Sequence, residues 1–131
     1  MASPPQPRAA RPVYLDLLSI RQPLPAIVSI LHRVSGAILF VAGIPLALAA
    51  LDASLRSPDA WTTLVTALSH PLAKLTALLL LWSYVHHLFA GIRHLLLDVH
   101  VGVSLQAARR SSAVVFVLAL LVTLAIALRL W

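Results

Sequence analysis

Three histidines and an arginine lie within one short apolar segment of this 131-residue chain, Tyr84-Val85-His86-His87-Leu88-Phe89-Ala90-Gly91-Ile92-Arg93-His94. On a helix, His87, Gly91 and His94 form one stripe, with about 10 Å between the two histidines along the axis. That spacing suits a porphyrin lying along the helix, with an imidazole at the iron, a glycine that lets the macrocycle approach the backbone, and a cationic group near the propionates. Because the chain contains no cysteine, an imidazole is the best available axial ligand. The alternative is that these histidines only form hydrogen bonds between helices.

The second axial ligand of such a haem cannot come from the same stripe. A six-coordinate haem takes its ligands from two opposite faces, so two histidines of one helix cannot bind one iron. His86 is rotated by about 100° from His87, and His70 lies about 25 Å away along the axis. His32 and His100 are expected near the membrane edge, where only the propionates would reach them. If the haem has two histidine ligands, another polypeptide provides the second one.

A second polar cluster, Ser29-Ile30-Leu31-His32-Arg33-Val34-Ser35-Gly36, stands at the start of the first long apolar run. Ser29, His32, Arg33 and Gly36 share one helical face, so a hydroxyl, an imidazole and a guanidinium converge. The functional interpretation is a site for an anionic or carbonyl ligand at the membrane interface. The alternative is that Arg33 extends to lipid headgroups and Ser29 caps the helix or bonds back to it.

These clusters must be positioned by three stretches that contain no Asp, Glu, Lys or Arg, each 18 residues long: 34–51, 75–92 and 111–128. A helix needs about 20 residues to cross a bilayer core, and continuous apolar runs lack the alternation of barrel strands. The sequence therefore predicts transmembrane helices at approximately 29–51, 66–95 and 109–130.

The composition supports this prediction. Hydrophobic residues make up 60% of the chain and charged residues only 11%, which excludes a soluble monomer. The net charge of +6 does not indicate nucleic acid, because so little polar surface remains. The predicted fold is a single all-α integral membrane domain over residues 1–131, which forms part of a helix bundle with other chains.

Basic residues are unevenly divided between the two sides of the predicted helices. Seven lie on the side of the N-terminus and the second loop, and three lie on the other side. The larger group is Arg8, Arg11, Arg21, Arg33, Arg93, Arg109 and Arg110, and the smaller group is Arg56, Lys74 and Arg129. The positive-inside rule therefore predicts a cytoplasmic N-terminus. We also expect a disordered tail over 1–11, a bend at Pro45, and a short first loop over 52–63.

Both polar clusters resemble signatures of the cytochrome b556 membrane-anchor subunits of succinate dehydrogenase, respiratory complex II. The first signature runs from Arg11-Pro12 through Leu17 and Leu24 to Ser29-x-x-His32-Arg33-x-Ser35, with all its fixed positions filled. The second is His87-x-x-x-Gly91-Ile92-Arg93-His94 followed by Asp98. Together with the three-helix layout, the resemblance covers nearly the whole chain.

The resemblance implies that His87 is the axial ligand of a single haem b shared with a second, smaller anchor subunit. It implies that Ser29 and Arg33 line a ubiquinone site, and that His32, Arg33 and His94 contact the haem propionates. Ser29 would then donate a hydrogen bond to a quinone carbonyl, and Arg33 would stabilise the negative charge that develops on reduction.

Three positions depart from the family pattern: His86, Leu97 and His100. They concern the packing around the haem and leave the axial ligand unaffected.

The function implied is that of a subunit which is not catalytic alone. It would dock the iron–sulfur subunit and the FAD flavoprotein subunit at the cytoplasmic side of a bacterial inner membrane, and electrons from succinate would pass through them to ubiquinone. One alternative is the anchor of a quinol:fumarate reductase. Another is a haem-free structural membrane subunit, for which the stripe of His87, Gly91 and His94 would not be required.

Overall fold

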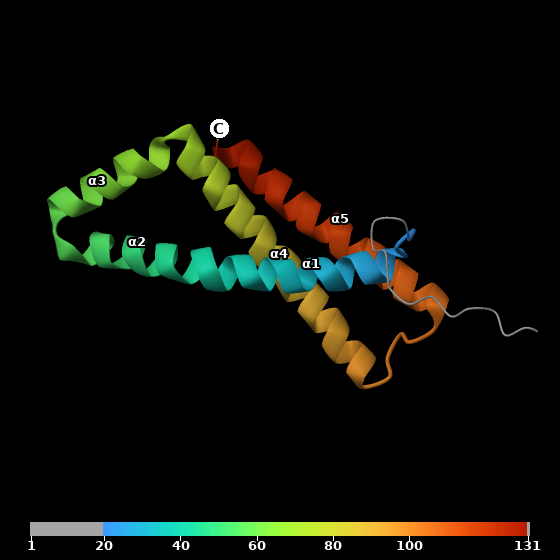
Figure 1. The fold of residues 1–131 in the computed structure, drawn as a ribbon. Coiled ribbons are helices and arrows are strands. Elements are labelled where there is room, and N and C mark those ends of the chain that lie inside the picture. Colours follow the sequence, from blue (N-terminus) through green and yellow to red (C-terminus); the bar gives the residue numbers. More distant parts are fainter. Residues whose placement is uncertain (1–19, 131) are drawn as a thin grey trace, which may run out of the picture.

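The computed structural model describes residues 20–130, and all regular elements in that range are helices (Figure 1). The predicted disordered tail and the first residues of the N-terminal signature lie outside the described residues. The elements are α1 (Leu24–Ile38), the π-helix η1 (Leu39–Gly43), α2 (Ile44–Arg56), α3 (Pro58–Ser69), α4 (Pro71–Asp98) and α5 (Leu105–Leu130).

Three helical segments of the described chain are long and apolar enough to cross a membrane: Leu24–Arg56, Pro71–Asp98 and Leu105–Leu130. The first is formed by α1, η1 and α2 in unbroken succession. The predicted all-α, three-helix transmembrane fold class is therefore confirmed.

The second spanning helix begins later than the predicted range of 66–95. Residues 66–69 belong to α3, because His70 has an extended backbone, with φ −67° and ψ 136°, and Pro71 disfavours a helical conformation in the residue before it. The Nδ1 atom of His70 accepts a hydrogen bond from the backbone N–H of Leu72 at 3.2 Å. His70 is thus the N-cap of α4.

The segment 52–63, predicted as a short loop, is mostly helical in the structure. Only Ser57 interrupts it, with φ −165° and ψ 162°. Its hydroxyl accepts a hydrogen bond from Ala60 N–H at 3.1 Å, while Pro58 and Asp59 occupy the first turn of α3. The turn residues that the sequence shows at this place therefore end one helix and cap the next.

Pro45 is the second residue of α2, just after the π-helix ends at Gly43. Proline has no N–H, and its ring clashes with the carbonyl four residues earlier in a regular α-helix. In η1 the backbone N–H of Ile44 instead bonds to the carbonyl of Leu39, five residues back. This wider turn accommodates the proline, and the chain continues into α2 (Figure 1).

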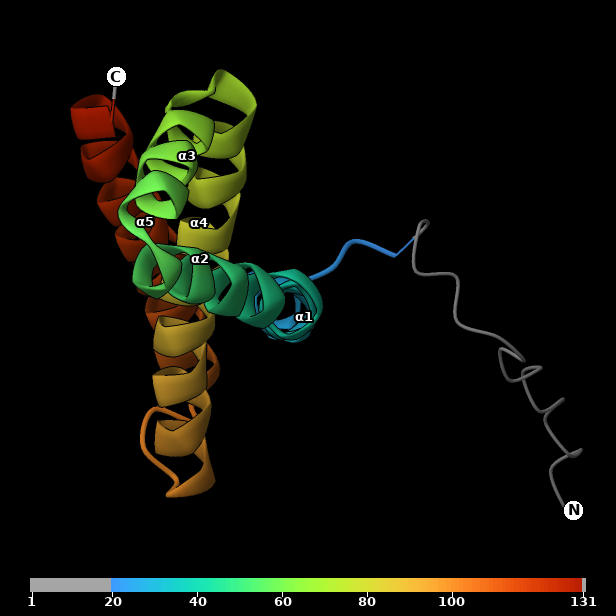
Figure 2. The same cartoon turned by 90° about the vertical axis from the view of Figure 1, so that its left-hand side faces the viewer.

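The helices α4 and α5 run antiparallel and side by side, and α1 crosses this pair (Figures 1 and 2). At the far end of the pair, Lys74 Nζ donates a hydrogen bond to the carbonyl of Leu130 at 2.9 Å. The helices α2 and α3 lead away from the crossing and return to the start of α4 (Figure 1).

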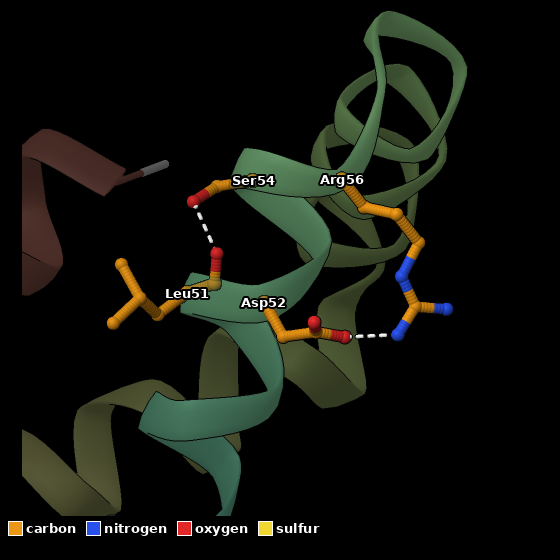
Figure 3. Close-up of polar contacts among 4 residues, drawn as sticks. All are labelled: Leu51, Asp52, Ser54 and Arg56. Atoms are coloured by element: carbon orange, nitrogen blue, oxygen red, sulfur yellow. Dashed lines mark hydrogen bonds and ion pairs between the residues drawn. The ribbon is translucent and has the colours of Figure 1, made fainter.

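The outer end of α2 carries only exposed polar contacts. Asp52 and Arg56 form an ion pair one helical turn apart, and Ser54 donates a hydrogen bond to the carbonyl of Leu51 at 2.7 Å (Figure 3).

The interior of the described chain is unusually polar. Its buried residues are five apolar ones, Val28, Val85, Ala90, Val115 and Ala119, and five polar ones, Ser35, Ser83, His86, Arg93 and Ser112. Large apolar side chains cover the outside, as a lipid environment requires. Small and polar side chains hold the helices together where they touch.

Candidate functional site

The candidate ligand His87 lies where α4 crosses α1. Its Nδ1 atom is 2.9 Å from the backbone carbonyl oxygen of His32. Because a carbonyl oxygen can only accept, Nδ1 carries the proton, and the lone pair of the ring remains on Nε2. A neutral imidazole held in this way is the form in which histidine binds a metal through Nε2.

Ser35 reinforces this orientation. Its side chain is fully buried, and its hydroxyl donates a hydrogen bond to the same His32 carbonyl at 3.0 Å. The hydroxyl oxygen also lies 3.4 Å from His87 Nδ1. Two groups of α1 therefore determine the position of one ring of α4.

Gly36 makes the close approach of the two helices possible. A Cβ atom at this position would lie 2.8 Å from Cε1 and 3.2 Å from Nδ1 of His87. Any larger residue would displace the imidazole, because 2.8 Å is well inside the contact distance of two carbon atoms.

Three imidazole rings gather at this crossing. The His32 ring stacks on the His87 ring, with centroids 4.1 Å apart and planes 13° apart. It also lies 5.1 Å from the His94 ring, at an interplanar angle of 48°. The three histidines do not converge on one point, since no group of three metal-ligating residues in the described chain could hold an ion. This arrangement fits one axial ligand for a larger group.

The His32 ring also contacts the ring of His87 itself, a contact that the sequence does not predict. The ring lies over Gly91, where a Cβ atom would be 3.4 Å from His32 Nε2. The glycine thus leaves room beside α4, and in this structure the His32 ring takes that room. The level at which two helices cross depends on their packing and cannot be read from spacing along one of them.

The helix α4 carries two stripes of chemically similar side chains on different faces. The histidine stripe consists of His87, Gly91 and His94, all half-buried and facing α1. The buried stripe consists of Ser83, His86, Ala90 and Arg93, with relative exposures of 0%, 0%, 0% and 6%. Its side chains meet α5, through the rings of His86 and Phe116 at 5.6 Å and the bond from Arg93 to Ser111.

The ring of His86 is enclosed by aromatic neighbours. It stacks on Trp82 with centroids 5.2 Å apart, and neither of its nitrogens has a hydrogen-bond partner in the described chain. His86 therefore lies on another face of α4 than His87, as helical geometry predicts.

The two residues predicted to bind a quinone lie on α1 within the crossing, Ser29 next to Val28 and Arg33 next to His32. Ser29 is half-buried and Arg33 is exposed, and neither is hydrogen-bonded to another residue of the described chain. Both therefore have donors available for a ligand. His100 lies apart from this group, in an exposed turn where its φ is 62°.

Comparison with known proteins agrees with this architecture. The family described as "Succinate dehydrogenase/Fumarate reductase transmembrane subunit" matches residues 7–126. The chain belongs to this family. It is therefore a membrane subunit of an enzyme complex and is not a catalyst on its own, as the sequence predicts.

Two relatives of this transmembrane subunit carry the name "Succinate dehydrogenase cytochrome b556 subunit". The protein from Coxiella burnetii (strain RSA 493 / Nine Mile phase I) is 36% identical over 124 residues, which are 94% of this chain and 98% of the relative. The protein from Paracoccus denitrificans is 36% identical over 105 residues, which are 80% of each chain.

The sequence analysis does not assign a role to two residues that the structure places at the candidate site of this family member. Ser35 orients His87, and Gly36 admits its ring. Both stand in the segment Ser29–Gly36 that the sequence singles out, and a pair of small residues next to a histidine is itself a signal of close helix contact.

Proposed function

We propose that this membrane subunit binds one haem b through Nε2 of His87. The observation that carries the proposal is the hydrogen bond from His87 Nδ1 to the carbonyl of His32, because it presents the metal-binding nitrogen of a neutral imidazole. The name cytochrome b556, which both relatives carry, supports it. Haem b, when bound, accepts and releases one electron at a time.

A second small anchor subunit would share the haem with this chain and would provide the other ligand. His94, the other histidine of the histidine stripe, lies on the same face as His87, so the two would not hold one iron together. His86 is enclosed within this chain. The half-buried histidine stripe therefore provides one half of a shared site.

His32 and His94 serve as hydrogen-bonding contacts for the propionates. For a macrocycle to lie along the histidine stripe, the His32 ring must leave its stacked position over Gly91. The carbonyl of His32, which orients His87, belongs to the backbone of α1 and does not depend on that ring. The ligand can therefore keep its orientation while the His32 side chain turns toward a propionate.

Ser29 and Arg33 bind the headgroup of ubiquinone. The Ser29 hydroxyl donates to one carbonyl, and the exposed Arg33 guanidinium stabilises the negative charge that develops as the headgroup is reduced. Arg33 is also within one helical turn of His32, so it can contact a propionate as well.

The other partners are the iron–sulfur subunit and the FAD flavoprotein subunit, which dock at the cytoplasmic face of a bacterial inner membrane. That face carries the start of α1 and the connection between α4 and α5, and most of the basic residues lie on this side. Electrons from succinate then pass through the two partners to ubiquinone.

The test is an optical spectrum of the complex purified through a tag on this chain, before and after addition of succinate. We expect a b-type band that appears on addition of succinate. A featureless spectrum with the partner subunits present would show a haem-free anchor and overturn the roles of His87, His32 and His94. A band that responds to menaquinol and fumarate, but not to succinate, would favour a quinol:fumarate reductase.

A further inference from the structure

Arg93 is the arginine of the buried stripe and is turned away from the candidate haem site. Its Nε donates to Ser111 Oγ at 3.0 Å, and one Nη donates to the carbonyl of Ala108 at 3.5 Å. A guanidinium has five N–H donors, so these two contacts leave most of them unused. No carboxylate of residues 20–130 lies within ion-pair distance of Arg93.

A permanent charge that is 6% exposed and has no counter-ion is costly in a membrane protein. Arg93 lies five residues before the end of α4, about 7.5 Å along the axis. This places the guanidinium near the level at which lipid headgroups meet the hydrocarbon core.

Arg93 and Ser111 form the polar end of a groove between α4 and α5. The groove has a volume of about 330 Å³, and its other lining side chains are apolar, among them Ile92, Leu96 and Val114. These three side chains are 46%, 46% and 54% exposed, so the groove opens toward the outer surface of the helix pair.

We propose that this groove binds one anionic phospholipid, which is a function beyond the proposed haem and quinone roles. The phosphate accepts hydrogen bonds from the remaining N–H groups of Arg93, which Ser111 and Ala108 hold in place, and an acyl chain lies along the apolar part between α4 and α5. A guanidinium matches a phosphate in charge and in bidentate geometry. A quinone headgroup is neutral and would leave the charge uncompensated, and a free phosphate ion would not use the apolar part of the groove.

The experiment uses the whole complex, purified in detergent through a tag on this chain. Native mass spectrometry then counts bound dioleoylphosphatidylglycerol in a titration, with dioleoylphosphatidylcholine as the neutral lipid. We expect one tightly retained phosphatidylglycerol per copy of this chain. Arg93→Gln should weaken its binding about tenfold, because a charge-assisted contact is lost. Arg109→Gln is the control, since Arg109 is exposed and outside the groove.

A second pair of variants keeps the charge and tests the groove. Val114→Trp should fill it and release the lipid, whereas Val117→Trp should not, because Val117 is equally exposed at 54% but does not line the groove. If Arg93→Gln fails to assemble, Val114→Trp and Val117→Trp still test whether the groove binds the lipid. The b-type spectrum should be the same in all four variants, which separates this proposal from the haem proposal.

Three results would overturn the proposal. Equal retention of the two lipids would show that charge is not recognised. Release of the bound lipid by millimolar inorganic phosphate would identify a site for a free anion. Displacement of the lipid by ubiquinone would assign the groove to the quinone.

Discussion

The two stripes of α4 have nearly the same sequence pattern and opposite surroundings. One reads His87-x-x-x-Gly91-x-x-His94, and the other, shifted by one residue, reads His86-x-x-x-Ala90-x-x-Arg93. Each has an imidazole, a small residue four positions later, and a cationic or imidazole group three positions after that. The histidine stripe faces α1 and stays half-open, whereas the buried stripe is closed between α1 and α5, with Ala90 packed against Val28 and Val115.

Access, and not residue type, distinguishes the candidate ligand site from helix packing in this chain. His87 has one nitrogen hydrogen-bonded to α1 and its other nitrogen available for a metal. His86 has the same ring, but it is enclosed by Trp82 and Phe116, and no described residue bonds to it. A large ligand shared with another polypeptide can reach only the first.

The largest expected effect is the difference in haem content between substitution of His87 and substitution of His86. His87→Ala should abolish the b-type absorption of the purified complex, because Nε2 is the proposed ligand. His86→Ala should leave the ratio of haem to protein unchanged. Difference spectroscopy measures the ratio of haem to protein in both variants. Loss of haem in His86→Ala together with its retention in His87→Ala would contradict the proposed role of His87.

Gly36→Ala should reduce haem affinity on the order of 10- to 100-fold, the range typical of residues that orient a metal ligand. The added Cβ would lie 2.8 Å from Cε1 of His87 and push the ring from its position. Gly43→Ala is the matched control in the same spanning segment. Its Cβ would lie 3.3 Å from the flexible end of Leu39 and at an ordinary contact distance of 3.7 Å from Leu39 Cβ and Leu80 Cδ2. Haem retention during dilution measures the difference, and equal losses in both variants would contradict the assigned role of Gly36.

Arg33→Ala should lower succinate:quinone reductase activity about 10-fold or more while the subunits still assemble, because a lost electrostatic donor affects the reduction step more than the fold. The exposed Arg110→Ala serves as the control. Activity at saturating quinone, with assembly checked by size-exclusion chromatography, tests this. Unchanged activity in Arg33→Ala would remove Arg33 from the quinone site.

The smallest effect is expected for His86→Phe, which should raise the free energy of unfolding by about 1 kcal/mol. The phenyl ring keeps the stacking on Trp82, and the substitution removes two buried ring nitrogens that have no partner in the described chain. Thermal unfolding of the complex measures it, with His87→Phe as the comparison. A lower transition temperature for His86→Phe would show that the nitrogens are hydrogen-bonded in the assembled protein.

Much of the fold is explained by local properties of the sequence. Uncharged stretches of 18 residues leave a helix as the structure that satisfies its backbone in lipid, so composition predicts the three spans. Local chemistry also explains the ends of helices, since Ser57 and His70 both act as N-caps before a proline. The prediction of a loop over 52–63 is nevertheless wrong, because the same residues that form turns also begin helices.

In the candidate site, the geometry of α4 sets which residues share a face, and the packing of helices sets which neighbour each face meets. Helical geometry alone places His87, Gly91 and His94 on one face, and it separates His86 from them by about 100°. It does not say which face meets α1 and which meets α5. That choice depends on packing: Gly36 permits α1 to approach His87, and Val28, Ala90 and Val115 form the small core at the crossing.

Hydropathy and helical periodicity are properties of a single segment, so they reveal the spans in the membrane, their number and the residues capable of chemistry. The contacts between helices, in contrast, bring His32 to His87, let Ser35 orient His87, and turn Arg93 toward a groove between α4 and α5. These features arise where helices distant in sequence touch, and the level of such a contact is set by the fit of many side chains at once.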